Sequence, residues 1–208
     1  MRLDSAGLPF IGGALALALI SGAAIGWVFA IPFVALAGFF AFFFRDPERV
    51  APGGAHQILS PADGRVLVAG AAIADAAPPG EWQQISIFLS PMDVHVNRIP
   101  AAGRVTRVTY TAGRFLPAYR HEAGSTNERS EIWIDHDGQT VVARQIVGLL
   151  ARRVVCRVQV GAVVRAGDRF GIMKFGSRMD VFLPRTATLL VEVGDLVRGG
   201  ETVIGVLH

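Results

Sequence analysis

The segment VGAVVRAGDRF, residues 160–170, recurs with small changes as VGDLVRGGETV, residues 193–203. Valine, glycine, valine, arginine and glycine stand at equivalent positions, and Asp168 matches Glu201 in charge. The shared pattern V-G-x-x-V-x-x-G places turn glycines beside short valine-rich strands, and it does so twice. We therefore expect a folded-over β unit, with the segment KFGSRMDVFLP (174–184) joining its two halves.

Short β-type runs fill most of the chain between Pro47 and the first repeat. They alternate or are β-branched, they are bounded by Gly, Pro and Asp, and they are too short for typical helices. The runs are GRVLVAG (64–70), QQISIFL (83–89), GRVTRVTYT (103–111), SEIWIDH (130–136), TVVARQIVGLL (140–150) and RRVVCRVQV (152–160). The predicted fold class is mostly β (α+β). Residues 47–208 are expected to form a β-sandwich or barrel-like domain, with turns similar to the hammerhead turns of lipoyl- and biotinyl-type domains.

The N-terminal region is apolar, with no charged residue from Ser5 to Phe44. Forty helical residues would measure about 60 Å, twice the ~30 Å hydrocarbon thickness of a bilayer. Gly26, Trp27 and Pro32 interrupt the run, so residues 1–46 are predicted to form a membrane-anchoring helical hairpin with arms at 8–25 and 28–44. A signal peptide is the alternative, but its apolar region would be shorter and would end at a small-residue cleavage site.

Charge and cysteine content indicate the compartment. Arg2 precedes the apolar run and Arg45 and Arg49 follow it, so a hairpin would place both ends on the cytoplasmic face of the inner membrane. Cys156 is the only cysteine, which suits a reducing compartment. Of the 20 basic residues only Lys174 is a lysine, and arginine's planar fork favours an anionic lipid surface over nucleic acid as partner. A genome of high GC content, which favours arginine over lysine, would produce the same bias.

Several kinds of chemistry can be weighed from the polar residues. Asp63, His95 and Ser177 supply one residue of each type in a serine hydrolase triad, but the G-x-S-x-G pattern is absent. The five histidines show no metal-ligand spacing, so no metal is expected. Lys174 could carry pyridoxal phosphate, but no glycine-rich phosphate cradle opens a helix.

The Gly176–Ser177 bond offers another chemistry, self-cleavage. A tight turn can press the Ser177 hydroxyl against the preceding carbonyl, giving an ester by an N-to-O acyl shift. Elimination then leaves dehydroalanine, and hydrolysis of that species leaves a pyruvoyl group at the start of the new chain. Glycine suits the leaving side because it lacks a Cβ and tolerates strained dihedrals.

Five segments in order resemble those of the phosphatidylserine decarboxylase proenzymes of the short bacterial type. They are FFRDPER (43–49), SPADGRV (60–66), SPMDVHVNRIP (90–100), NERSE (127–131) and KFGSRMDVFLP (174–184). The resemblance implies a carboxy-lyase that cleaves itself into a β chain, 1–176, and an α chain, 177–208, which stay associated. Its cofactor would be covalent pyruvate formed from Ser177. A Schiff base with phosphatidylserine would give phosphatidylethanolamine, and homo-oligomerisation is left open.

Residue roles follow from the resemblance. Asp63 matches the family's acidic residue in self-processing, and His95 matches the histidine that transfers a proton during decarboxylation. Longer members carry a second histidine where this chain has Arg98, so either His95 covers both roles or His121 or His136 substitutes.

Three cations are candidates for contact with substrate. Arg178 stands where the family commonly has threonine, and it could bind a phosphate or the departing carboxylate. Arg129 and Lys174 are further candidates for the headgroup phosphate. The competing functions are a non-enzymatic, membrane-anchored β-sandwich adaptor, and a serine hydrolase using Asp63, His95 and Ser177.

Overall fold

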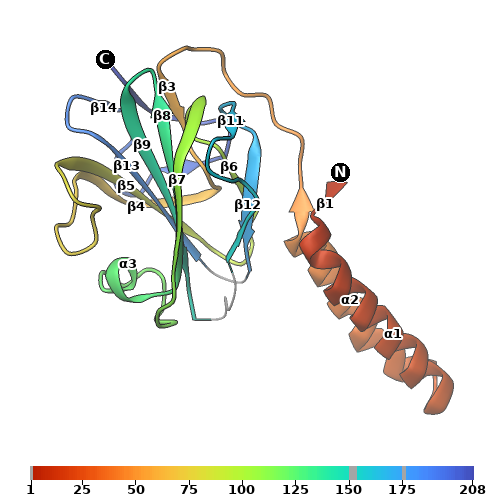
Figure 1. Cartoon of the computed structure of the whole chain (residues 1–208). Coiled ribbons are helices and arrows are strands. Elements are labelled where there is room, and N and C mark those ends of the chain that lie inside the picture. The colour runs from red at the N-terminus through yellow and green to blue at the C-terminus, as the bar shows by residue number, and fades with distance from the viewer. Residues whose placement is uncertain (1, 150–153, 175–176) are drawn as a thin grey trace. The chain divides into compact units, whose positions relative to one another are not determined.

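The computed structural model of the chain describes residues 2–149, 154–174 and 177–208 (Figure 1). Contacts divide the chain into two compact units, Met1–Glu48 and Arg49–His208. The Gly176 side of the predicted cleavage site lies outside the described residues.

The first unit is a pair of apolar helices. It contains β1 (Arg2–Leu3), η1 (Ser5–Gly7), α1 (Leu8–Ala24), η2 (Trp27–Ala30), α2 (Ile31–Phe43) and β2 (Arg45–Asp46). The helices reverse at Gly26, whose φ of 129° suits glycine, and β1 pairs with β2 to close the open end. The helical segment Ser5–Ala24 is long and apolar enough to cross a membrane, whereas Trp27–Phe43 is shorter.

The second unit is built almost entirely of strands. An eight-stranded antiparallel sheet has the order β11-β7-β8-β9-β13-β5-β4-β15, and two three-stranded sheets have the orders β10-β12-β6 and β14-β16-β3. A single turn of helix, α3 (Ala123–Thr126), lies near the end of the large sheet at which β13 begins (Figure 1). The strands are β3 (Gln57–Leu59), β4 (Gly64–Ala71), β5 (Trp82–Leu89), β6 (Val96–Arg98), β7 (Gly103–Thr111), β8 (Arg129–His136), β9 (Gln139–Val147), β10 (Val154–Cys156), β11 (Val163–Val164), β12 (Arg169–Met173), β13 (Ser177–Pro184), β14 (Thr188–Leu189), β15 (Leu196–Val197) and β16 (Val203–Val206). The prediction of a mostly β fold preceded by an apolar helical pair is confirmed.

The two sequence repeats form opposite edges of the large sheet. In the first repeat β11 pairs with β7, and in the second β15 pairs with β4. The equivalent glycines Gly161 and Gly194 have φ values of 90° and 103°, and each donates its N–H to the neighbouring strand. Each repeat therefore makes a turn that glycine favours and then caps one edge of the sheet.

The repeat is longer than those edge segments. HVNRIPAAGRV (95–105) and HQILSPADGRV (56–66) share H-x-x-x-x-P-A-x-G-R-V, and both lead from a three-stranded sheet into the large sheet. The order of the strands is symmetric about an approximate two-fold axis between β9 and β13. The strands from β6 to β12 form one set, and their counterparts are β3, β4 and β5 together with the strands from β13 to β16. One half thus occupies residues 95–173, and the other occupies 56–89 and 177–207.

The first half is inserted into the second between β5 and β13. Its own β8 and β9 are joined by the tight turn Asp137–Gly138, with φ values of 51° and 85°. The corresponding strands β5 and β13 pair in the same register, yet the whole first half separates them in sequence. Ser177 is the first residue of the chain as it re-enters the sheet.

Candidate active site

Ser177 begins the central strand β13 and is completely buried. It lies opposite Leu89 of β5 and Val147 of β9, and it shares the core-facing side of the strand with Met179 and Val181. Its Oγ has no hydrogen-bond partner among the residues that the structure describes. Buried hydroxyls are nearly always hydrogen-bonded, so this one stands out among the described residues.

His95 lies immediately before β6 and is also fully buried. Its Nδ1 is 3.0 Å from the carbonyl oxygen of Asp93, and its own carbonyl accepts a hydrogen bond of 3.3 Å from the N–H of Met173. The histidine and the serine therefore stand at the two ends of the short chain segment 174–176. Leu89, the last residue of β5, pairs with Ser177, so the loop between β5 and β6 begins beside the serine. His95 is the last residue of this loop.

Asp63 lies in the turn before β4, two strands from Ser177. Its Oδ2 is 2.7 Å from Nη2 of Arg49, and its Oδ1 accepts a 2.8 Å hydrogen bond from the N–H of Gly199. Within the described part of the chain, the partners of its carboxylate are thus Arg49 and Gly199, not His95 or Ser177. Asp63 and Ser177 belong to one half of the molecule and His95 to the other, and among the described residues the Ser–His–Asp chain of hydrogen bonds typical of a serine hydrolase is not formed through Asp63.

Arg178 points to the opposite side of the sheet from Ser177. Its guanidinium bonds Asp180 through two nitrogens, at 2.6 and 2.9 Å, and reaches Oγ of Ser86 at 2.9 Å. The residue is 2% exposed. Arg178 thus has intramolecular partners on the side of the sheet covered by α3, where a Cβ on Gly124 would lie 3.5 Å from its Nη2.

A second buried arginine, Arg144, continues this polar layer. It pairs with Glu131 at 2.6 Å, donates to the carbonyl of Ala76, and lies over the ring of Phe182 at 4.8 Å. Burial lowers the pKa of Arg144, and the nearby carboxylates of Glu131 and Asp180 act in the opposite direction. The two arginines are matched by two carboxylates, as buried charges require.

The other predicted cations are placed as follows. Arg129 donates to the carbonyl of Ser125 at 2.8 Å, and Lys174 is half-buried directly after β12. Arg98, at the place of the second family histidine, is buried and donates to the carbonyl of Gly167 at 2.9 Å. No cluster of three or more metal-ligating side chains is present within 2–149, 154–174 and 177–208.

The two substitute histidines differ in position. His136 ends β8 opposite Gln139, whereas Ser177 lies level with the far end of β9, at Val147. His136 is therefore separated from Ser177 by the length of a strand. His121 is exposed and lies in the segment just before α3, at the same end of the sheet as Ser177.

Two buried side chains that the sequence did not single out also lie here, Asn97 of β6 and Gln145 of β9. Nε2 of Gln145 donates to Oδ1 of Asn97 at 2.8 Å, and neither side chain is exposed. The signal that could have found Asn97 is the repeat itself, because HVNRIPAAGRV has asparagine where HQILSPADGRV has Ile58.

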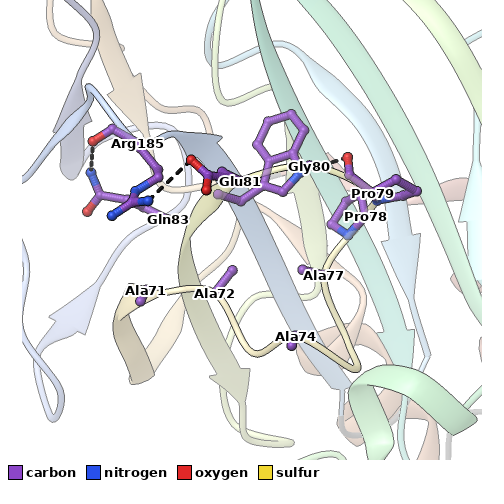
Figure 2. Close-up of a pocket in the computed structure, with 11 residues that line it drawn as sticks. Ala71, Ala72, Ala74, Ala77, Pro78, Pro79, Gly80, Glu81, Gln83 and Arg185 are labelled. Atoms are coloured by element: carbon purple, nitrogen blue, oxygen red, sulfur yellow. Dashed lines mark hydrogen bonds and ion pairs between the residues drawn. The ribbon is translucent and has the colours of Figure 1, made fainter.

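A cavity of about 770 Å³ lies away from these residues (Figure 2). It is formed by the β4–β5 connection and by Arg185, which pairs with Glu81 at 3.2 Å. Trp82, in its wall, pairs with Pro184 at the end of β13 that is opposite to Ser177. The cavity is therefore separate from the candidate active site.

Comparison with known proteins identifies close relatives. A family model described as phosphatidylserine decarboxylase matches residues 36–205. Proteins named phosphatidylserine decarboxylase proenzyme are similar over most of their length. The one from Nitrosomonas europaea is 43% identical over 97% of this chain and 94% of its own. Those from Granulibacter bethesdensis and Desulfotalea psychrophila are 45% and 40% identical, over 94% and 96% of this chain and 82% and 94% of their own.

Proposed function

Because this chain belongs to the phosphatidylserine decarboxylase family of carboxy-lyases, we propose that it converts phosphatidylserine to phosphatidylethanolamine with a pyruvoyl group made from its own Ser177. The sequence resemblance to the family is confirmed, and the relatives' description as proenzymes indicates a precursor. The observation that carries the finer proposal is the Ser177 hydroxyl, which is buried at the start of β13 with no partner among the described residues.

The cleavage chemistry balances with one molecule of water. Oγ of Ser177 adds to the carbonyl carbon of Gly176, the C–N bond breaks, and the hydroxyl proton passes to the released nitrogen. The resulting ester loses the Cα proton of residue 177, and the Gly176 carboxylate leaves. Water then displaces ammonia from the dehydroalanine, which leaves a pyruvoyl group at the new N-terminus of the α chain.

The residues present fit this group. The Ser177 side chain faces the molecular interior, on the same face of the sheet as Gln145, whose amide bonds Asn97. When formed, the pyruvoyl ketone supplies an electrophile for a Schiff base with the substrate amine and an electron sink for loss of CO₂. Water is restricted at this buried position, which strengthens hydrogen bonds and charge interactions around residue 177.

His95 is proposed to transfer the proton that replaces the departing carboxylate. An imidazole has an ordinary pKa near 6.5, so it can hold or release a proton at neutral pH. The Asp93 carbonyl 3.0 Å from Nδ1 suits a protonated Nδ1, and this tautomer leaves Nε2 as the exchanging atom.

Asp63 is proposed to support self-cleavage, and its ties to Arg49 and Gly199 fix the SPADG turn. Arg129 and Lys174 remain candidates for the headgroup phosphate. Arg178 also remains one, although its guanidinium is engaged by Asp180.

The enzyme is proposed to act at the cytoplasmic face of the inner membrane. The apolar helices α1 and α2 support attachment to a bilayer, and the arginines at 2, 45 and 49 favour the cytoplasmic side for both ends of the hairpin. After cleavage the α chain would stay in place, since β13 pairs along its length with β9 and β5.

Intact mass spectrometry tests the proposal. The purified wild-type protein should contain two chains, the smaller one blocked at its N-terminus and starting at the converted Ser177. Ser177→Ala should remain a single 22.2 kDa chain and should have no decarboxylase activity. A wild-type protein that stays in one piece would contradict the pyruvoyl mechanism. Labelling of Ser177 by a fluorophosphonate probe would instead favour a hydrolase.

A further inference from the structure

The buried amide pair of Asn97 and Gln145 joins the two sheets next to Ser177. Asn97 belongs to the sheet β10-β12-β6 and Gln145 to the eight-stranded sheet, and their side chains are 2.8 Å apart. Nε2 of Gln145 also lies 3.4 Å from the carbonyl oxygen of Val155. A Cβ on Gly171 would lie only 2.8 Å from this nitrogen, so a glycine makes room for the amide.

This pair leaves a donor and an acceptor unused. Nδ2 of Asn97, Oε1 of Gln145 and Oγ of Ser177 are all buried without a hydrogen-bond partner within the described part of the chain. Gln145 lies opposite Met179, and Val147 lies opposite Ser177, so Gln145 and Ser177 are diagonal neighbours on the same face of the sheet. Three buried polar groups without a partner among the described residues therefore occupy neighbouring positions in the interior, where each is costly.

The other half of the molecule shows that packing does not require these amides. The approximate two-fold axis relates Asn97 to Ile58 and Gln145 to Leu183, and both apolar residues belong to the hydrophobic core. Gly205 corresponds to Gly171, and a Cβ there would lie 3.2 Å from Cδ1 of Leu183. The equivalent strands of the other half are thus buried with isoleucine and leucine in place of the two amides.

From these observations we propose that the Asn97–Gln145 pair is the hydrogen-bonding site that positions the side-chain oxygen of residue 177 for self-cleavage. Oε1 of Gln145 can accept a hydrogen bond from the Ser177 hydroxyl, and Nδ2 of Asn97 can donate a hydrogen bond to Oγ of Ser177. The hydrogen bond from Nε2 of Gln145 to Oδ1 of Asn97 occupies one end of each carboxamide, which leaves Oε1 of Gln145 and Nδ2 of Asn97 for residue 177. The inference rests on the proposed self-cleavage, and it gives both amides the role of positioning residues.

The test replaces the pair with its counterpart from the other half. The full chain carrying Asn97→Ile and Gln145→Leu is synthesised in vitro, and conversion of the 22.2 kDa precursor is followed by gel electrophoresis and mass spectrometry. Cleavage should be roughly tenfold to hundredfold slower than in the wild type, because positioning errors of about an ångström have such effects. The thermal unfolding midpoint of the Asn97→Ile, Gln145→Leu variant should not be lower than that of Ser177→Ala, which serves as the uncleaved reference.

A swapped variant, Asn97→Gln with Gln145→Asn, distinguishes positioning from packing. It keeps both carboxamides, so it should recover a cleavage rate within about threefold of the wild type, because the hydrogen-bonding groups rather than the volume are restored. Should the isoleucine–leucine variant fail to fold, Gln145→Met, which keeps the length of the side chain, should show the slow cleavage instead.

The outcomes separate this inference from the proposed function. The inference alone is overturned if the wild type cleaves and a folded isoleucine–leucine variant, or Gln145→Met, cleaves equally fast. A wild-type precursor that never cleaves overturns the proposed function and the inference with it. Slow cleavage in the apolar variants with recovery in the swapped variant supports both.

Discussion

Arg178 and Asp180, two residues apart on β13, hold each other in a bidentate ion pair, with Nε 2.6 Å from Oδ1 and Nη2 2.9 Å from Oδ2. Alternate residues of a strand share a face, so this pair fixes the side to which 178 and 180 point. Ser177 must then point to the other side, into the core. A slip of one residue would bury the serine among the charges, and the ion pair opposes that slip.

Arg178→Ala should destabilise the uncleaved Ser177→Ala protein by about 3–5 kcal/mol, because it leaves the Asp180 carboxylate buried without its cation. Urea unfolding in detergent measures the change. The matched control is Arg185→Ala, since the Arg185–Glu81 pair is 68% and 78% exposed and should contribute less than about 1 kcal/mol. Equal losses in the two variants would show that the buried pair does not secure β13.

Asp63→Asn should slow self-cleavage while the chain remains folded, since the amide keeps the size of the side chain but loses the charge facing Arg49. A time course of precursor conversion measures the effect. Glu201→Gln is the control, because Glu201 contacts the same guanidinium at 3.3 Å from a more exposed position. If both variants slow cleavage equally, the effect belongs to Arg49 and not to Asp63.

His95→Ala should separate the two proposed reactions, self-cleavage at Ser177 and decarboxylation of the substrate. We expect cleavage to continue and decarboxylation to fall by at least about a hundredfold, the usual contribution of a positioned proton donor. Release of CO₂ from phosphatidylserine and intact mass, measured on one preparation, test this. Loss of cleavage in the same variant would instead mean that His95 also performs the role of the second family histidine.

Cys156 should react slowly with iodoacetamide in the folded protein. Burial raises the pKa of its thiol, so little thiolate is present at pH 8. The raised pKa also means that the native state holds this proton more tightly than the unfolded state. The corresponding stability is present below the ordinary thiol pKa and is lost as the pH rises through the native value. Urea midpoints measured from pH 7 to 10 should fall less in Cys156→Ala than in the wild type.

Local pattern was enough to predict several features. The charge-free run predicted the helices α1 and α2, and the glycines of 160–170 and 193–203 predicted equivalent turns. Period-two alternation predicted most of the long strands. The family motifs also assign roles to Ser177, Asp63 and His95, and these roles stay predictions.

Features that depend on strand register could not be predicted from the sequence. That Arg178 faces Asp180 and Ser86 depends on the pairing of β13 with β5, whose partner residues are 88 (Ser177–Leu89) to 102 (Pro184–Trp82) positions apart. The contact between Asn97 and Gln145 likewise needs the packing of one sheet on another. The sequence suggests a role for Arg49, within FFRDPER, only in orienting the hairpin in the membrane, whereas in the structure its guanidinium bonds the Asp63 carboxylate.

The central position of β13 in the large sheet bears on whether folding or the proposed cleavage comes first. The 32-residue piece that begins at Ser177, from 177 to 208, supplies β13 and also the edge strand β15. If this piece were cleaved off before folding, β13 would have to insert between β9 and β5, which could pair with each other in its absence. If the proposed cleavage takes place only in the finished sheet, this problem does not arise, and the cleaved chain would identify the molecules that have folded correctly.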